Sequence, residues 1–520
     1  MSIESYLQKL GFVGDPFAHT NAEQEDRLGD YFVPPPYFQS VLGDPSTPKS
    51  NVIFAPRGGG KTAQRLMIER EAVGPDATYL CLTYDAFASV VSSGGALGAH
   101  QVELCRSVTL AILSYLQEDS VEAIFLSDHE RQIVKIAAQQ FVGKLGLGEY
   151  RAAVAAVKTL GDKAADFWRT YGGPVAAGVA LLMKKAGLDD VNISITLEEQ
   201  AQDSSTASSY YFLSQLIGIA QKLGWEAVYF LVDKVDETPA TTNNAEAAGK
   251  LIRDLVTDLP TLETPGAAFK FFFWDQMEQY LRANGLRGDR VEVVNLGWTI
   301  NELSQMLARR LAAFSNGTLT SFNQLVEEEA TVDSHTLLVY LSHGSPRDMI
   351  RMARSIVKEH TRMPDEAAKI SSRTLARGIT EFSKESTLEK FGRFQSDFSR
   401  IPSASFTLTE LASVFKISTT GVTNKVNAWI PTGAVGPLGT RPNPGARPLN
   451  LYGFTDLRIV IASSSDPIGE VLSTKAVECG DCAIVIYADE TELDCPNCGS
   501  KVVRGTARSL LDICRLDTEV

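Results

Sequence analysis

Eight consecutive residues, from Ala55 to Thr62, have the types and the order needed to hold a chain of phosphates. They read A-P-R-G-G-G-K-T, with an apolar run at 51–54 before them and a helix-forming stretch after them. Small residues let consecutive backbone N–H groups wrap a phosphate, a lysine reaches the terminal phosphates, and a hydroxyl binds magnesium. The alternative is a glycine-rich turn with an incidental lysine. The predicted nucleotide-binding residues are Ala55, Arg57, Gly58, Gly59, Gly60, Lys61 and Thr62, and Thr62 is also a predicted Mg²⁺ ligand.

Acidic residues follow a second apolar run. Residues 227–232 read A-V-Y-F-L-V and lead into D-K-V-D-E. An acidic residue at the carboxyl end of a buried strand beside a phosphate loop holds magnesium and the attacking water. We therefore expect Asp233 to bind Mg²⁺, directly or through water, and Asp236 or Glu237 to orient the water, with Glu237 preferred. The alternative is a solvated helix start, where negative charge suits the helix dipole.

Three arginines are further candidates for the site. Arg287 and Arg290 precede an apolar run at 291–294, and either could complete a neighbouring subunit's site as an arginine finger. Arg347 falls in the first turn of a predicted helix at 346–360 and could point from a lid at the nucleotide. The alternatives are a surface ion pair for the loop arginines and an exposed helix position for Arg347.

The apolar runs and helical periodicities predict an α/β fold with a parallel sheet, and the glycine-rich loop after its first strand predicts that the sheet is of the P-loop NTPase type. The expected strands lie at 51–54, 77–84, 227–232, 268–274 and 291–294. Helical patterns at 102–116, 129–141 and 149–159, with a β-like piece at 191–195, predict an insertion over about 100–220. Helices at 300–314, 334–341, 346–360 and 372–384 would form a lid. The predicted division is 1–47 (lead-in), 48–299 (ATPase core), 300–395 (lid), 396–465 (winged helix) and 466–520 (zinc ribbon).

A helix-turn-helix is predicted from 406–415, a turn at 416–418 and a second helix at 419–430. Arg441, Arg447 and residues 449–452 could form a β-wing. Residues 401–460 carry a local excess of three positive charges, which suggests a double-stranded DNA face. A protein-binding winged helix is the alternative. The candidate groove-facing residues are Thr420, Thr423, Asn424 and Lys425.

Two C-x-x-C pairs near the C-terminus predict a structural metal site. Cys479 and Cys482 are separated by twelve residues from Cys495 and Cys498. Four thiolates at this spacing are typical of a tetrahedral zinc ribbon, and such a site leaves no open position for catalysis. A redox pair is the weaker alternative.

Composition limits the class of protein. A chain of 520 residues is too long for one hydrophobic core, and its net charge of −14 excludes nucleic-acid binding through global positive charge. Residues 1–5 lack a secretory signal pattern, and the apolar stretch 171–183 is too short to span a bilayer. We therefore expect a cytoplasmic protein with no membrane contact.

The order of these parts resembles the P-loop ATPases of the AAA+ and STAND groups, most closely the origin-recognition type of bacterial and archaeal ATPase. The resemblance covers about residues 45–460 and rests on A-P-R-G-G-G-K-T, Y-F-L-V-D-K-V-D-E, G-D-R and G-S-P-R. It implies ATP rather than GTP, a homo-oligomer, a nucleotide-sensing role for Arg347 and a role for Arg290 across a subunit interface. The D-x-x-D-E spacing is more similar to that of STAND ATPases.

Two functions are compatible with this organisation. The first is an oligomerising, nucleotide-switched ATPase that acts on DNA or a DNA-associated complex. The second is a slow-turnover regulatory scaffold that recognises a protein partner through its tail, within a bacterial antiviral system. A small-molecule kinase would leave the lid, the winged helix and the ribbon unexplained.

Overall fold

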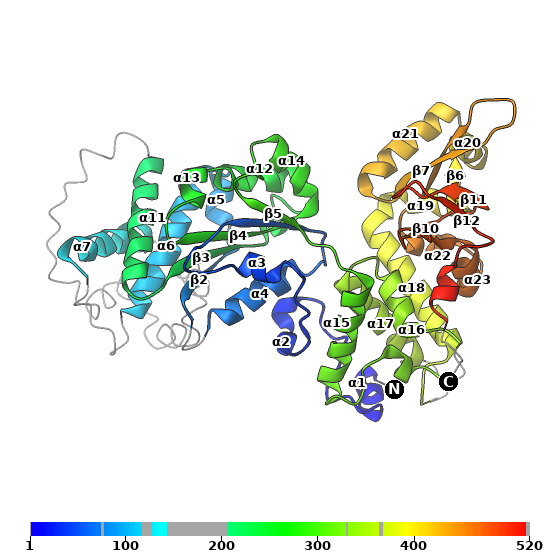
Figure 1. Cartoon of the computed structure of the whole chain (residues 1–520), viewed down its shortest axis with the longest axis horizontal. Helices are drawn as coiled ribbons and strands as arrows, with labels where there is room; N and C mark the ends of the chain where they lie inside the picture. The colour runs from blue at the N-terminus through cyan, green and yellow to red at the C-terminus, as the bar shows by residue number, and fades with distance from the viewer. Residues whose placement is uncertain are drawn as a thin grey trace. The chain divides into compact units, whose positions relative to one another are not determined.

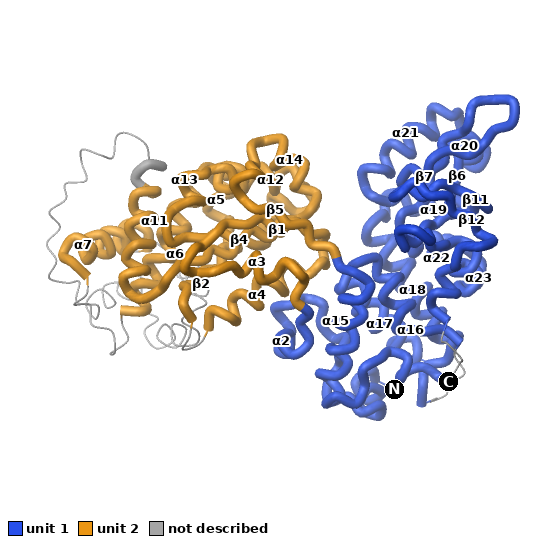
Figure 2. Tube along the Cα trace, viewed as in Figure 1, with its two compact units in different colours: residues 1–33, 298–520 blue, residues 34–297 orange. Residues whose placement is uncertain are grey.

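The computed structural model describes residues 2–73, 77–116, 126–142, 205–328, 331–362 and 368–515. The chain forms two compact units (Figure 2): unit 2 is residues 34–297, and unit 1 is residues 1–33 with 298–520. The sequence patterns at 149–159, 171–183 and 191–195 lie outside the described residues. Because unit 1 contains both ends of the chain, unit 2 is an insertion within it.

A five-stranded parallel sheet forms the centre of unit 2 (Figure 1). The strand order is β2-β3-β4-β1-β5, and every neighbouring pair is parallel. All carboxyl ends therefore lie at one edge of the sheet. The predicted α/β class with a parallel sheet is confirmed. The strands are β1 (Asn51–Ala55), β2 (Tyr79–Tyr84), β3 (Ala227–Val232), β4 (Ala267–Trp274) and β5 (Glu292–Asn295).

Strands β1 to β4 are buried at every position, because layers cover both faces of the sheet. Alternate residues such as Phe54, Phe230 and Phe271 enter one large apolar core with helices α6 and α11. Strand β5 lies at the edge and is exposed at both of its ends. The helices of unit 2 are α3 (Phe38–Leu42), α4 (Lys61–Glu71), α5 (Ala88–Ser92), α6 (Leu97–Tyr115), α7 (Asp128–Ala137), α11 (Ser205–Lys222), α12 (Ala245–Val256), α13 (Leu259–Leu262) and α14 (Glu278–Ala283).

Unit 1 begins with the N-terminal segment and continues with helices that start at clear caps. Thr299 forms a capping box with Glu302, and Ser345 caps a helix whose first residue is proline. The N-terminal segment shares a core with these helices through Tyr6 and Phe17. The helices are α1 (Ile3–Lys9), α2 (Leu28–Tyr31), α15 (Ile300–Phe314), α16 (Ser334–Leu341), α17 (Pro346–Thr361) and α18 (Ser372–Phe391).

The C-terminal part of unit 1 combines two short helices with an antiparallel sheet of order β6-β8-β7. The first helix begins at Leu408, two residues later than the sequence pattern starts, because residues 405–407 pair with β8 instead. Thr407 and Glu410 form its capping box. The elements are α19 (Gln395–Phe398), β6 (Ser405–Thr407), α20 (Leu408–Phe415), α21 (Thr419–Trp429), β7 (Val435–Arg441), β8 (Leu449–Phe454), α22 (Leu457–Ser463) and α23 (Ile468–Thr474).

Two small hairpins follow and have a core of their own. Strand β9 (Ala476–Glu478) pairs with β10 (Val485–Tyr487), and β11 (Glu492–Asp494) pairs with β12 (Lys501–Val503). A last helix, α24 (Leu510–Ile513), precedes the end of the described residues. Within the part of the chain that the structure describes, we find no helix with the length and apolarity to cross a membrane.

Candidate functional site

The glycine-rich loop joins the carboxyl end of β1 to the start of α4. Gly58 and Gly60 have φ angles of 79° and 95°, which glycine adopts without steric cost. A Cβ on Gly59 would lie 2.9 Å from the carbonyl oxygen of Pro56. Gly60 precedes α4 without a side-chain cap, and a helix start of this kind binds anions well.

Lys61 and Thr62 occupy the first turn of α4. The ammonium of Lys61 donates to the carbonyl oxygens of Ala55, at 3.0 Å, and Pro56, at 3.2 Å. Burial lowers the pKa of Lys61, while the nearby carboxylates of Asp236 and Asp233 act to raise it. The Thr62 hydroxyl donates to Asp233 Oδ2 at 3.0 Å. The structure therefore brings the predicted magnesium ligands into direct contact.

Asp233 is 2% exposed and is held from two sides. Its Oδ1 accepts from the backbone N–H of Lys234 at 2.9 Å, and its Oδ2 accepts from Arg65 Nε at 3.0 Å. Arg65 is 1% exposed and also pairs with Glu69. Arg65 was not among the predicted site residues. Its spacing of four from Glu69 predicts a helical ion pair, but nothing local indicates that the guanidinium reaches the end of β3.

Asp236 and Glu237 lie in the short 3₁₀ turn η4 (Val235–Glu237), and their surroundings differ. Asp236 is buried and accepts from Arg57 Nε at 3.0 Å, whereas Glu237 is exposed. Arg57 therefore contacts a predicted water-orienting residue from within the loop itself. Strand β4 lies between β1 and β3, so the residues after its end, beginning with Asp275, belong to the same edge of the sheet.

The three candidate arginines lie elsewhere and are exposed. Arg287 pairs with Asp289, and Arg290 pairs with Glu263 at 2.6 Å. Both precede β5, at the amino edge of the parallel sheet, which is the edge opposite the glycine loop. Arg290 could therefore serve only a neighbouring subunit's site. Arg347 lies in the first turn of α17, in unit 1.

The four predicted zinc ligands come together in the C-terminal hairpins. Their Sγ atoms all lie within 4.8 Å of one another, with 3.6 Å between Cys479 and Cys498 and 3.6 Å between Cys482 and Cys495. Zn–S bonds of about 2.3 Å in a tetrahedron place sulfurs about 3.8 Å apart. The cluster therefore fits a Zn²⁺ ion.

The two Cys pairs have the same backbone geometry. Cys479 O accepts from Ala483 N at 2.8 Å, and Cys495 O accepts from Gly499 N at 2.9 Å. Ala483 and Gly499 have φ angles of 58° and 78°. Hydrogen bonds from Ser500 lower the pKa of the Cys498 thiol to about 6, which favours the thiolate that metals bind. Each pair thus supplies two of the four sulfur atoms of the cluster.

No protein-family model matches the sequence, and no curated protein gives a significant match. The parallel sheet is compatible with a P-loop fold, and the four-cysteine cluster fits a zinc ribbon. Membership of the AAA+ or STAND groups stays a prediction.

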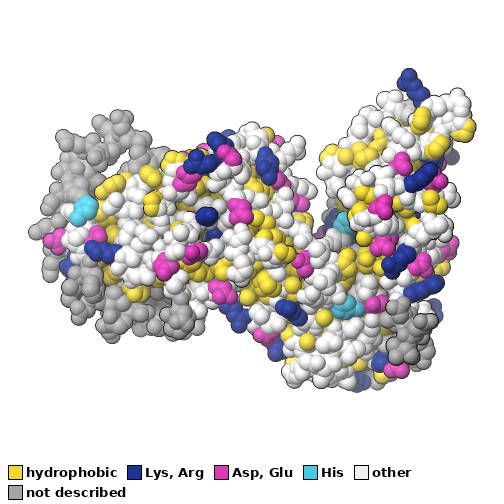
Figure 3. All heavy atoms as spheres, viewed as in Figure 1, with side chains coloured by type: hydrophobic (Ala, Val, Ile, Leu, Met, Phe, Trp, Pro, Cys, Tyr) yellow, Lys and Arg dark blue, Asp and Glu magenta, His cyan; other side chains and the backbone are white. Residues whose placement is uncertain are grey.

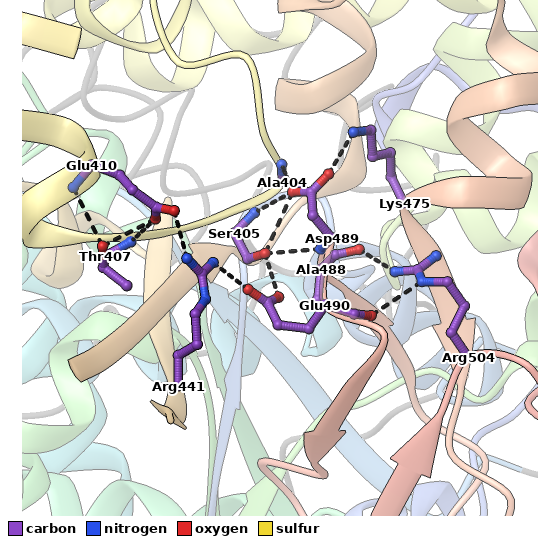
Figure 4. Close-up of polar contacts among 10 residues, drawn as sticks. All are labelled: Ala404, Ser405, Thr407, Glu410, Arg441, Lys475, Ala488, Asp489, Glu490 and Arg504. Carbon is purple, nitrogen blue, oxygen red and sulfur yellow. Dashed lines mark hydrogen bonds and ion pairs between the residues drawn. The ribbon is translucent and has the colours of Figure 1, made fainter. Parts of the chain in front are cut away.

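Polar contacts join the four-cysteine hairpins to the β6-β8-β7 sheet (Figure 4). Asp489 accepts from the backbone N–H groups of Ala404, at 2.6 Å, and Ser405, at 3.0 Å. The Arg441 guanidinium lies between the carboxylates of Glu410 and Glu490 and pairs with both. The hairpins and the sheet therefore form one module.

Three of the five basic residues at 401–460 have acidic neighbours. Lys425 pairs with Asp397 at 2.7 Å, and Arg441 pairs with Glu410 and Glu490. Arg458 is 1% exposed and pairs with Asp348 and Asp456. Three of these acids, Asp397, Glu490 and Asp348, lie outside residues 401–460, so the count over that range overstates the positive charge around these residues. On the face shown in Figure 3, basic and acidic side chains of the described residues are interspersed.

Proposed function

We propose that the protein is a P-loop ATPase that works as a nucleotide-dependent switch. The observation that carries this proposal is the hydrogen bond between Thr62 and Asp233, beside Lys61, at the carboxyl edge of a parallel sheet. A phosphate loop, a hydroxyl and an acidic strand end in this arrangement form the shared machinery of phosphoryl-transfer proteins.

Each residue has a distinct role in this proposal. The N–H groups of Gly58 to Thr62 bind the phosphates, and Lys61 leaves the carbonyls of Ala55 and Pro56 to neutralise the terminal phosphates. Thr62 and Asp233 offer the oxygen ligands that Mg²⁺ prefers. When bound, Mg²⁺ neutralises charge that develops on the phosphate oxygens.

Glu237 or Asp236 orients the attacking water. Asp236 is paired with Arg57 in this structure, whereas Glu237 is exposed, which supports the preference for Glu237. The nucleotide is inferred to be ATP, and the active form to be a homo-oligomer, from the resemblance to AAA+ and STAND ATPases. In such an assembly Arg290 would exchange Glu263 for the nucleotide site of the next subunit.

The C-terminal module is proposed to be a winged helix fused to a zinc ribbon. Helices α20 and α21 supply the helix-turn-helix, and β7 and β8 supply the wing. Double-stranded DNA is the first candidate partner. The pairing of Lys425, Arg441 and Arg458 with carboxylates favours the second candidate, a protein partner of a slow-turnover scaffold.

ATP hydrolysis by the purified full-length protein tests both parts of the proposal. Turnover should be measured alone and with double-stranded or single-stranded DNA, with Lys61→Ala as the blank. The variant Lys416→Glu/Arg447→Glu reverses two exposed positive charges of the C-terminal module. If DNA stimulates turnover of the wild type but not of this variant, the result would support DNA as the partner. Slow turnover that DNA does not change would favour the protein partner. Equal turnover by wild type and Lys61→Ala would exclude the proposed site.

A further inference from the structure

We propose that Arg57 distinguishes a nucleoside triphosphate from a diphosphate, by exchanging Asp236 for the terminal phosphate. The inference rests on the proposed function and assigns a specificity role within the same site. The exchange would also release Asp236 when a triphosphate binds, and not when a diphosphate binds.

Each of the three nitrogens of the Arg57 guanidinium has a partner near the glycine loop. Its Nε lies 3.0 Å from Asp236 Oδ2, and one terminal nitrogen lies 3.3 Å from the carbonyl oxygen of Asp236. The other terminal nitrogen donates to Asn243 Oδ1 at 2.5 Å. The guanidinium carbon lies 4.2 Å from the centre of the Trp274 ring, at the end of β4. Arg57 thus links the loop to the segments that follow β3 and β4.

The position of Arg57 in the chain brings it to any bound phosphate. It is the residue before Gly58, within the loop whose N–H groups surround the anion, and it lies four residues before Lys61. The charge of Asp236 acts to raise the pKa of Lys61, and the charge of Arg57 acts to lower it, so both charges reach Lys61. The charges of Asp233 and Asp275 also act to raise the pKa of Lys61.

The exchange is chemically reasonable because a guanidinium binds carboxylate and phosphate with the same planar fork. The Arg57 side chain is 36% exposed, so it can move, whereas the Asp236 side chain is 7% exposed and fixed in a 3₁₀ turn. The γ-phosphate of a triphosphate carries more negative charge than one carboxylate and therefore competes with Asp236 for Arg57. A diphosphate lacks this third phosphate.

Release of Asp236 would give η4 a second carboxylate, beside that of Glu237, that could orient water. In this structure Arg57 Nε pairs with the Asp236 carboxylate, and a terminal nitrogen contacts the main-chain carbonyl of Asp236, so the carboxylate is directed at Arg57 and not at a water. After the exchange, the Asp236 carboxylate becomes available at the carboxyl edge of the sheet. If Asp236 orients the water, turnover would then require the triphosphate itself to release it.

Equilibrium binding of Mg-ADP and of a non-hydrolysable Mg-ATP analogue to the full-length protein tests the inference. Arg57→Ala should weaken analogue binding about tenfold or more and change ADP binding less than about twofold, because only the terminal phosphate loses a charge-assisted contact. Asp236→Asn should tighten analogue binding more than ADP binding, since it weakens the partner that competes with the γ-phosphate for Arg57. Arg57→Lys keeps the positive charge but not the planar fork of the guanidinium. Its affinity for the analogue should therefore lie between those of wild type and Arg57→Ala.

Tryptophan fluorescence provides a second readout. The analogue, and not ADP, should change the emission of Trp274, and the change should be absent in Arg57→Ala and in Trp274→Phe. Thermal unfolding of each variant checks that it is folded.

The outcomes separate this inference from the function on which it rests. If wild type binds both nucleotides and Arg57→Ala loses affinity for both equally, or for neither, the inference is wrong and the ATPase proposal stands. If wild type binds neither nucleotide, the proposed function fails and the inference fails with it.

Discussion

Lys270 and Arg65 are both buried cations of unit 2, but their partners differ. Arg65 is paired with the carboxylates of Asp233 and Glu69. Lys270 is 0% exposed and donates to neutral oxygens, the carbonyl of Lys49 at 2.7 Å and Asn51 Oδ1 at 2.6 Å. Burial lowers the pKa of Lys270 to about 7, and the charge of Glu292 offsets this shift only in part. The charged form of Lys270 is therefore disfavoured in the folded protein.

Lys270→Met should remove a pH dependence of stability. Between pH about 7 and the unfolded-state lysine pKa of about 10.4, the unfolded chain holds a proton at this position that the folded chain lacks. The free energy of unfolding of the wild type should therefore rise with pH in this window, by up to about 1.4 kcal/mol per pH unit. Urea unfolding at pH 7, 8 and 9 measures the slope. Lys49 is exposed, so Lys49→Met should keep the wild-type slope of unfolding free energy against pH. If Lys270→Met also kept the wild-type slope, Lys270 would not be the source of the pH dependence.

At the site, the residues that the sequence could identify are those of local motifs. The glycine loop, Lys61, Thr62 and the two cysteine pairs depend on spacing within a few residues, so their types identify them. Arg65 and the partners of Arg57 depend on contacts between segments more than 160 residues apart, such as Arg65 with Asp233. No local pattern encodes those contacts.

At the scale of elements, caps and buried runs made most of the fold predictable. The helices α15 and α16 have the bounds expected from sequence, 300–314 and 334–341, because Thr299 and Asp333 cap them. The strands β1 to β4 were recognisable because parallel strands buried on both faces are continuous apolar runs. Strand β6 was missed, since three residues next to a helix carry no periodicity of their own.

The turns that follow the two C-x-x-C pairs differ at one equivalent position. This difference should affect the stability of the four-cysteine hairpins. Ala483 has a φ of 58°, where an L-residue is strained, whereas Gly499 fills the same place at 78°. Ala483→Gly should stabilise the zinc module by about 0.5 kcal/mol, after the entropy of the added glycine is subtracted, and Gly499→Ala should destabilise it by about 1 kcal/mol.

The urea midpoint of zinc release, followed with a colorimetric chelator, measures both changes. The protein should bind one zinc per chain. Gly480→Ala is the control, because Gly480 lies in the same turn without a positive φ and with open space at its Cβ. A lower midpoint for Ala483→Gly than for wild type would contradict the account.

At the scale of the whole molecule, the N-terminal segment belongs to unit 1 rather than to the sheet that follows it. Arg310 of α15 is 2% exposed and holds this segment through the carbonyl of His19, at 3.1 Å, and the hydroxyl of Tyr31, at 2.9 Å, and through an ion pair with Glu25. The sequence suggested a single lead-in over 1–47. Arg310 is 285 residues from Glu25, so their pairing could not be read from the chain.

Arg310→Met and Arg309→Met form a matched test of this docking. Arg310→Met leaves the carboxylate of Glu25 buried without its cation, so it should lower the free energy of unfolding of unit 1 by about 3 kcal/mol or more. Arg309 is exposed and makes one hydrogen bond, to the carbonyl of Phe32, so Arg309→Met should cost no more than about 0.5 kcal/mol. Limited proteolysis should cut residues 1–33 faster in Arg310→Met only. Equal effects of the two substitutions would show that the segment is not held by Arg310.

If Lys61, Thr62 and Asp233 form a magnesium-nucleotide site, equilibrium binding of ATP in the presence of Mg²⁺ or of EDTA should reveal it. We predict that wild type binds Mg-ATP more tightly than metal-free ATP, that Thr62→Ala loses this preference, and that Lys61→Ala binds either form at least about tenfold more weakly. Binding of Mg-ATP that is unchanged in both variants, or absent in the folded wild type, would contradict the account.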